Sequence, residues 1–117
     1  MDALSRSLVE GIADALVVVD ETRTVVEWNA AMVRTTGVPR GRALGQPAEK
    51  AAPLLRDPEV AARLGEALAG DTPGPVELPH ADPAAGRPVW LEARCAPWRD
   101  AAGRVAGALV FFTDITE

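Results

Sequence analysis

The residue with the most reactive side chain is Cys95, the single cysteine of the 117-residue chain. It alternates with Val89, Leu91 and Ala93 in an apolar segment, a pattern typical of a strand with one buried face. Activation of a thiol is favoured by a general base nearby, and this segment offers none. We therefore predict that Cys95 is a small core residue. A single cysteine also excludes an internal disulfide.

The only imidazole belongs to His80, in the segment 78–82. We expect this histidine at the end of a strand, exposed to solvent. One histidine and one cysteine are too few for a protein-only zinc site, so no metal site is predicted. Nucleophilic catalysis needs a base that is oriented by a third group, and the sequence assembles no such set. We predict no catalytic residues and no enzyme activity.

The first elements that must position these residues are a helix and a hairpin. An apolar stripe at helical spacing predicts an amphipathic helix over about residues 3–13; its members are Leu4, Leu8, Val9 and Ile12. The β-branched segments 15–20 and 24–28 flank a polar turn. They predict an antiparallel pair of strands.

A block of short helices should follow. Asn29 has the side chain of a helix N-cap, and Gly37 suits the end of that helix over 30–36. Residues 39–45 indicate a helical turn. A short helix and a loop both remain open for residues 46–56.

A longer helix and three strands complete the chain. The run Asp57-Pro58-Glu59 combines a cap, a first-turn proline and an acid, so a helix should begin here and end at Gly70. The Pro-rich segment 71–88 predicts a short edge strand at 76–78 and a loop at 83–86. Residues 90–117 then read as two strands joined by a turn at 99–104. Strands that flank a helical block indicate an α+β domain with an antiparallel sheet.

Composition restricts the function classes. The formal net charge of −5 argues against a nucleic-acid-binding surface, which needs a basic patch. No apolar run approaches the roughly 18 residues of a membrane span, and no signal peptide precedes the domain. We therefore expect a soluble, cytoplasmic piece without membrane contact, cut from a longer protein.

The ordered set of motifs from Leu4 to Glu117 resembles a PAS domain. The opening hairpin is followed by an asparagine that starts a helix, as is common in that family, and the closing hairpin ends in an Asp-Ile-Thr signature. The residues that carry the likeness are Asn29, Gly37, Gly41, Gly45, Trp90, Pro97, Asp100, Gly103, Gly107, Asp114, Ile115 and Thr116.

The resemblance implies one domain over residues 1–117, with a core from about residue 14. It implies a five-stranded antiparallel sheet of order 2-1-5-4-3, helices on one face and an N-terminal flanking helix. Some members hold a ligand between sheet and helices, whereas in others this space is a filled core; both remain open here. The candidate lining is Trp28, Leu44, Leu64, Leu91, Cys95, Leu109 and Phe111.

The resemblance also reduces the number of cofactors that the chain is expected to bind. Haem-binding relatives take a histidine from the long helix, which here lacks one. Flavin relatives that form a photoadduct carry a cysteine near the position of residues 42–46, where none stands. The cinnamoyl chromophore requires a tyrosine, and the chain has no tyrosine. All three cofactors are disfavoured, so we expect no cofactor, with an unidentified ligand as the alternative.

In the family, the terminal motif couples the last strand to the output domain, which implies this role for Asp114 and Thr116. The Asp commonly pairs with a basic residue of the same sheet, here Arg104, Arg94 or Arg99. The N-terminal helix often mediates dimerisation, so Leu4, Leu8, Val9 and Ile12 are the candidate interface. Trp90 and Trp98 share a strand face opposite to Cys95 and are expected on the outer side of the sheet.

Three functional hypotheses follow from the resemblance. The first is a sensory, signal-relay and dimerisation domain of a bacterial-type signalling protein, such as a sensor histidine kinase. The second is a receptor domain that binds a small apolar ligand. The third is a protein-interaction module without a ligand. The expected partners are a second copy of the chain and a downstream effector.

Overall fold

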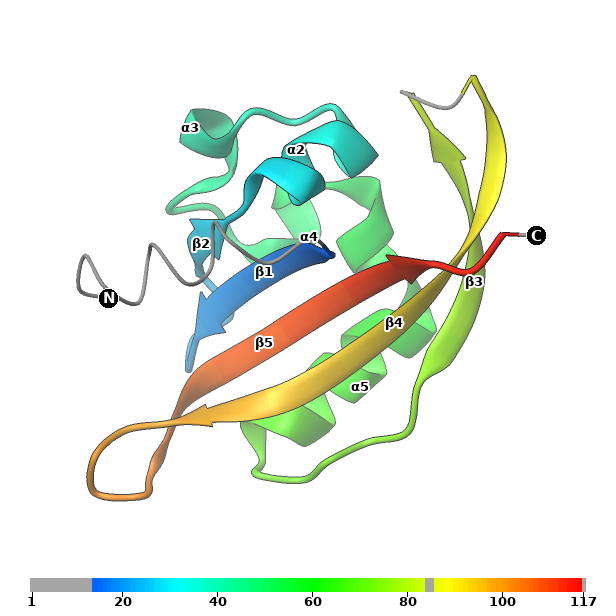
Figure 1. Cartoon of the computed structure of the whole chain (residues 1–117). Coiled ribbons are helices and arrows are strands. Elements are labelled where there is room, and N and C mark those ends of the chain that lie inside the picture. Colours follow the sequence, from blue (N-terminus) through cyan, green and yellow to red (C-terminus); the bar gives the residue numbers. More distant parts are fainter. Residues whose placement is uncertain (1–13, 84–85, 117) are drawn as a thin grey trace.

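A five-stranded antiparallel sheet forms the centre of the molecule (Figure 1). The structure, a computed structural model, describes residues 14–83 and 86–116. The strands are β1 (Ala15–Asp20), β2 (Val25–Trp28), β3 (Val76–Asp82), β4 (Arg87–Arg99) and β5 (Val105–Asp114). Their spatial order is β2-β1-β5-β4-β3. The predicted α+β class and strand order are confirmed.

The helices lie on one side of this sheet (Figure 1). They are α2 (Ala30–Thr36), α3 (Arg40–Ala43), α4 (Ala48–Ala51), the 3₁₀-helix η1 (Pro53–Arg56) and α5 (Pro58–Leu68). Helix α5 contacts β4 and β5, and α2 contacts β1. Residues 46–56, which the sequence left open, therefore contain two short helices. The helix predicted over 3–13 lies outside the described residues.

Asn29 joins the first hairpin to the helical block. Its Oδ1 accepts from the amide of Met32 at 2.9 Å, the N-cap bond predicted for this residue. The same oxygen accepts from the amide of Leu16 at 3.0 Å, and Nδ2 donates to the carbonyl of Asp14 at 2.8 Å. One fully buried side chain thus fixes α2 relative to the start of β1.

Helix α5 begins at the predicted cap. Asp57 Oδ1 accepts from the amides of Glu59 and Val60 at 3.0 and 3.1 Å. Val60, Leu64 and Ala67 form its buried stripe, which packs towards the sheet.

Strand β3 is longer than the three residues predicted, because it continues through Pro79 to Asp82. Among the described strands it pairs only with β4, from Val76 opposite Ala93 to Asp82 opposite Arg87. A proline is tolerated there because an edge strand has one side without a neighbouring strand. The Pro-rich composition correctly predicted a strand at the edge of the sheet, but the predicted strand was too short.

Each face of the sheet carries an apolar cluster. The larger cluster lies between sheet and helices and includes Trp28, Met32 and Phe112. A smaller cluster on the other face contains the buried Leu16 and Val18. Val26, Trp98, Leu109 and Phe111 pack against this second cluster.

Candidate functional site

Most of the predicted lining residues lie between the sheet and the helices. Trp28, Leu64 and Leu91 are buried there, and Leu44 packs partly buried against the same cluster. The indole Nε1 of Trp28 donates to the carbonyl of Val38 at 3.0 Å. A role for these residues in ligand binding remains a prediction.

The prediction for Leu109 and Phe111 is wrong in its geometry. Both side chains pack on the opposite face of the sheet, with Leu16, Val18 and Trp98. The register explains the difference, because Cys95 pairs with Val110, so Val110 shares its face. Phe111 instead borders a hollow of about 490 Å³ that also touches Arg94, Ala96 and Thr113.

Cys95 occupies the inner cluster, as its alternation pattern predicted. Its side chain is buried. Burial raises the pKa of the thiol to about 11, although the charge of Arg63 acts in the opposite direction. A thiol with this pKa is protonated at neutral pH and is a poor nucleophile.

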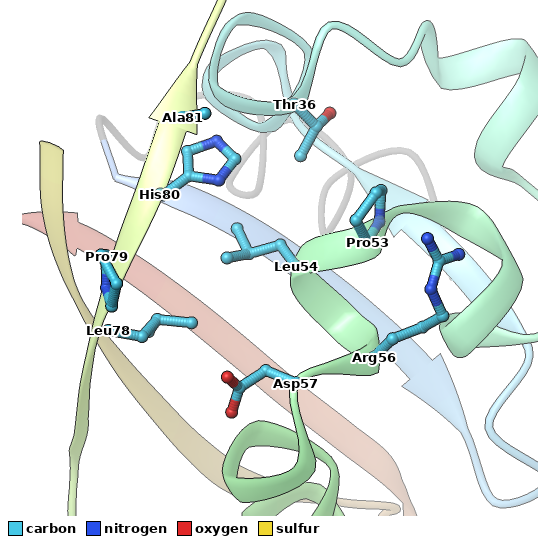
Figure 2. Close-up of a pocket in the computed structure, with 9 residues that line it drawn as sticks. All are labelled: Thr36, Pro53, Leu54, Arg56, Asp57, Leu78, Pro79, His80 and Ala81. Atoms are coloured by element: carbon cyan, nitrogen blue, oxygen red, sulfur yellow. The ribbon is translucent and has the colours of Figure 1, made fainter. Parts of the chain in front are cut away.

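A groove opens between the edge strand β3 and helix η1, and we call it the β3–η1 groove (Figure 2). Its volume is about 530 Å³. Leu54 and Leu78 are both 5% exposed and form its apolar floor. The complete lining is Thr36, Pro53, Leu54, Arg56, Asp57, Leu78, Pro79, His80 and Ala81.

His80 lies on one side of this groove, and its predicted exposure is wrong. The imidazole is half-buried because Nε2 donates to the carbonyl of Thr35, at the end of α2, over 2.7 Å. The bond connects the edge strand to the helical block. Sequence spacing could not reveal it, because the two residues are 45 positions apart.

The terminal motif forms a compact tie between β5 and β4, which we call the C-terminal tie. Asp114 Oδ1 accepts from the amide of Thr116 at 2.8 Å. Thr116 Oγ1 accepts from the amide of Trp90 at 2.8 Å, and the amide of Ile115 donates to the Trp90 carbonyl at 2.9 Å. The bonds from Thr116 hold the pKa of the Asp114 carboxyl below its ordinary value.

The predicted basic partners of Asp114 are wrong. Arg104 pairs with Asp100 at 3.6 Å, in the turn between β4 and β5 at the other end of these strands. Arg94 pairs with Glu92 at 2.6 Å. The guanidinium of Arg99 donates to the carbonyls of Gly70 and Gly103. The basic charge that acts on Asp114 is that of Arg87.

The structure also places the remaining candidates. Trp98 packs on the outer face, as predicted, and Trp90 is 51% exposed. The candidate dimer residues Leu4, Leu8, Val9 and Ile12 lie outside the described residues. Sequence reasoning missed the β3–η1 groove, although the helix cap predicted at Asp57 lies in its lining.

Two general properties can be stated for the part of the chain that the structure describes. Within residues 14–83 and 86–116, no three His, Cys, Asp or Glu side chains gather as a metal site requires. None of the helices described there has the length and apolar character needed to cross a bilayer.

The fold and sequence match known proteins. The sequence model of the PAS fold matches residues 9–117. A search of curated proteins gave no significant match. Among solved structures, the PAS domain of a protein from Colwellia psychrerythraea has a TM-score of 0.70 and 24% identity, over 98% of each chain.

Two proteins of Vibrio cholerae are also similar. A sensory box sensor histidine kinase has a TM-score of 0.72 and 16% identity, over 97% of this chain and 91% of that chain. The VqmA dimer has a TM-score of 0.75 and 19% identity, over 99% of this chain and 52% of that one. The chain thus spans about half the length of VqmA, which has also been solved bound to DPO. At these identities the likeness to solved structures shows the fold, whereas the match to the sequence model covers nearly the whole chain. The chain therefore belongs to the PAS fold family.

Proposed function

We propose that this PAS domain relays a signal to an output domain of a larger signalling protein, such as a sensor histidine kinase. The observation that carries the proposal is the C-terminal tie. Three hydrogen bonds among Asp114, Ile115, Thr116 and Trp90 fix the direction in which the chain leaves the sheet. A shift of β4 against β5 would therefore alter the direction of any segment that follows.

The position of Asp114 supports this role. Asp114 lines a hollow of about 270 Å³ between the end of β5 and α2, together with Thr35. The carbonyl of Thr35 accepts the hydrogen bond from His80 in the β3–η1 groove. His80 in the groove is thus bonded to Thr35, and Thr35 borders the same hollow as Asp114 of the C-terminal tie. Because proximity alone does not demonstrate energetic coupling between the groove and the tie, the coupling needs an experimental test.

The relay can be tested in chimeras with a histidine kinase of known output. Residues 1–117 are joined to the kinase core through seven linkers that differ by one residue each, which samples every helical phase. Autophosphorylation is then measured with Thr116→Val, which removes the acceptor of the Trp90 amide. We expect kinase activity to change at least about threefold, an ordinary magnitude for coupling between sites.

The matched control for this experiment is Thr72→Val, an exposed threonine in the loop after α5. It should leave kinase activity unchanged. Equal activity of wild type and Thr116→Val in all seven linker phases would show that the tie does not transmit the signal.

We also propose that the domain forms homodimers and acts without chemistry of its own. The apolar stripe Leu4, Leu8, Val9 and Ile12 and the exposed Trp90 support self-association. Sedimentation velocity should give twice the chain mass for the wild type and the monomer mass for Leu8→Glu. A wild type that sediments as a monomer at about 100 μM, a concentration at which even weak association is visible, argues against dimerisation.

A receptor for a small ligand is the second candidate function. The β3–η1 groove favours it, because its volume of about 530 Å³ lies within the usual range of small-molecule sites. Native mass spectrometry and an absorbance spectrum of the purified chain test for a retained molecule. Extra mass beyond the polypeptide would support a receptor, and the bare mass would leave the relay to be driven by weaker ligands or by partners.

A further inference from the structure

The β3–η1 groove has an apolar floor between two polar side chains. Figure 2 shows Leu54 and Leu78 between the imidazole of His80 on one side and the carboxylate of Asp57 on the other. The carboxylate points towards β3. A ligand in this groove would therefore meet apolar surface along its body and polar atoms near its ends.

An anionic ligand finds no backbone donors at the start of α5. Helix N-termini usually attract anions through free N–H groups. Here Asp57 Oδ1 already accepts from the amides of Glu59 and Val60. The amide of Ala61 donates to the Asp57 carbonyl at 2.9 Å, and Pro58 has no N–H group. The backbone donors of this first turn are therefore used.

The polar atoms that remain in the groove are acceptors. The second carboxylate oxygen of Asp57, Oδ2, has no hydrogen bond or ion pair with another described residue. His80 donates through Nε2 to a carbonyl oxygen, so Nδ1 of the neutral ring is an acceptor. The hydroxyl of Thr36 donates to the Met32 carbonyl and accepts from the Val38 amide, so its bonding is satisfied locally.

The cationic side chain in the lining is turned away. Arg56 donates through Nη1 to the carbonyl of Glu49 at 3.2 Å. Figure 2 shows its guanidinium on the side of η1 that faces away from β3. The space between η1 and β3 is thus dominated by the negative charge of Asp57, in a chain whose net charge is −5.

We propose that the β3–η1 groove binds a small organic ammonium compound. Its apolar body would lie on Leu54 and Leu78, and its ammonium group would donate to Asp57 Oδ2. The acceptor Nδ1 of His80 would take a second donor of the ligand. The proposal deepens the receptor function proposed above, because it names the chemistry of the input.

The first test compares three probes that share a phenylethyl body and differ in charge. 2-Phenylethylammonium, 2-phenylethanol and 3-phenylpropionate are titrated at low salt into the isotopically labelled 117-residue chain, and amide shifts are followed by NMR. We expect the ammonium probe to shift amides of the groove lining and to bind at least about tenfold more tightly than the alcohol, because its hydrogen bond is charge-assisted. The carboxylate should not bind.

The second test removes the charge and keeps the helix cap. Asp57→Asn still offers a side-chain oxygen to the amides of Glu59 and Val60, since asparagine is an equally good N-cap. We expect the ammonium probe to bind about tenfold more weakly to this variant, with an unchanged melting temperature. The matched control is Asp71→Asn, which alters the net charge equally at an exposed position and should leave the affinity unchanged.

Four results would overturn the proposal, and three of them concern affinity. These three are no binding of the ammonium probe at about 10 mM, equal affinity of the carboxylate probe, and equal affinity of the Asp57→Asn variant for the ammonium probe. Shifts confined to the outer sheet face, around Arg94 and Phe111, would also refute it. The relay is tested separately, because it is measured as the kinase activity of Thr116→Val, whereas binding of the ammonium probe is measured at the groove of the unmodified chain.

Discussion

At the scale of single residues, Gly107 shows how closely the strands approach each other. It stands opposite Asp20 of β1 and Trp98 of β4, on the central strand β5. A Cβ at this position would overlap the carbonyl oxygen of Val19. Because that atom belongs to the backbone, the contact can be relieved only by moving a strand of the sheet.

We therefore predict that Gly107→Ala lowers the free energy of unfolding by at least about 2 kcal/mol, the magnitude of severe steric changes in a packed core. Urea unfolding measures the change. Gly41→Ala is the control, because nothing lies within 4 Å of a Cβ there and the residue is helical. Its effect should be stabilising by less than about 1 kcal/mol. Equal effects of the two substitutions would contradict this account.

Asp20 provides a prediction on pH dependence. Burial raises the pKa of its carboxyl, but hydrogen bonds from Thr22 and Thr24 outweigh burial and lower the pKa. A lowered pKa in the folded state means that the carboxylate stabilises the fold fully above the ordinary value of about 3.9. This contribution is lost as the pH falls through the lowered value. NMR titration should give a pKa below about 3.9 for Asp20, and a value at or above it would refute the prediction.

At the scale of elements, the helix caps and the faces of β4 were predictable, whereas the faces of β5 were not. The sequence predicts the helix ends at Asn29, Gly37 and Asp57, because capping depends on residues only a few positions apart. Strand β5 is apolar on both faces, because the outer face also packs against Leu16 and Val18. Its apolar pattern therefore does not reveal which side chains face the helices, and the inner position predicted for Leu109 and Phe111 was wrong. The pairing of β5 with β4 decides which side chains of β5 face the helices.

The length of β3 was missed for a related reason. Pro79 and the flanking prolines lower the local strand propensity, whereas the thirteen-residue partner β4 supplies the pairing. The hydrogen-bonded pairing with β4 therefore outweighs the low strand propensity of the local sequence. His80 is placed in the groove by this longer strand, which is why its hydrogen bond to Thr35 could not be foreseen.

The hydrogen bonds of Asn29, which connect α2 to the start of β1, give a prediction at this scale. Asn29→Ala removes the cap of α2 and both side-chain bonds to the start of β1, so we expect a loss of about 2–4 kcal/mol of unfolding free energy. Asn29→Ser keeps an N-cap oxygen but cannot bond β1 on both sides, so its cost should be about half as large. Chemical denaturation of both variants checks the order. A serine variant that is as unstable as the alanine variant would show that the cap contributes little.

At the scale of the whole molecule, the groove and the C-terminal tie are built from segments far apart in the chain. Helix η1 and strand β3 form the walls of the groove (Figure 2), and β4 and β5 form the tie. Between them lies the hydrogen bond from His80 to Thr35, a residue that borders the same hollow as Asp114. The family and its sheet could be predicted from motif order, whereas this arrangement depends on tertiary packing.

The most direct test of the account is amide hydrogen exchange at the tie while the groove is filled. The amides of Ile115 and Trp90 both bond across the tie. With saturating 2-phenylethylammonium we predict at least about a threefold change in their exchange rates, and a smaller change in Asp57→Asn at the same concentration, because fewer variant molecules hold the probe. Probe binding that shifts the groove amides but leaves the exchange of Ile115 and Trp90 unaltered would contradict a relay from groove to tie.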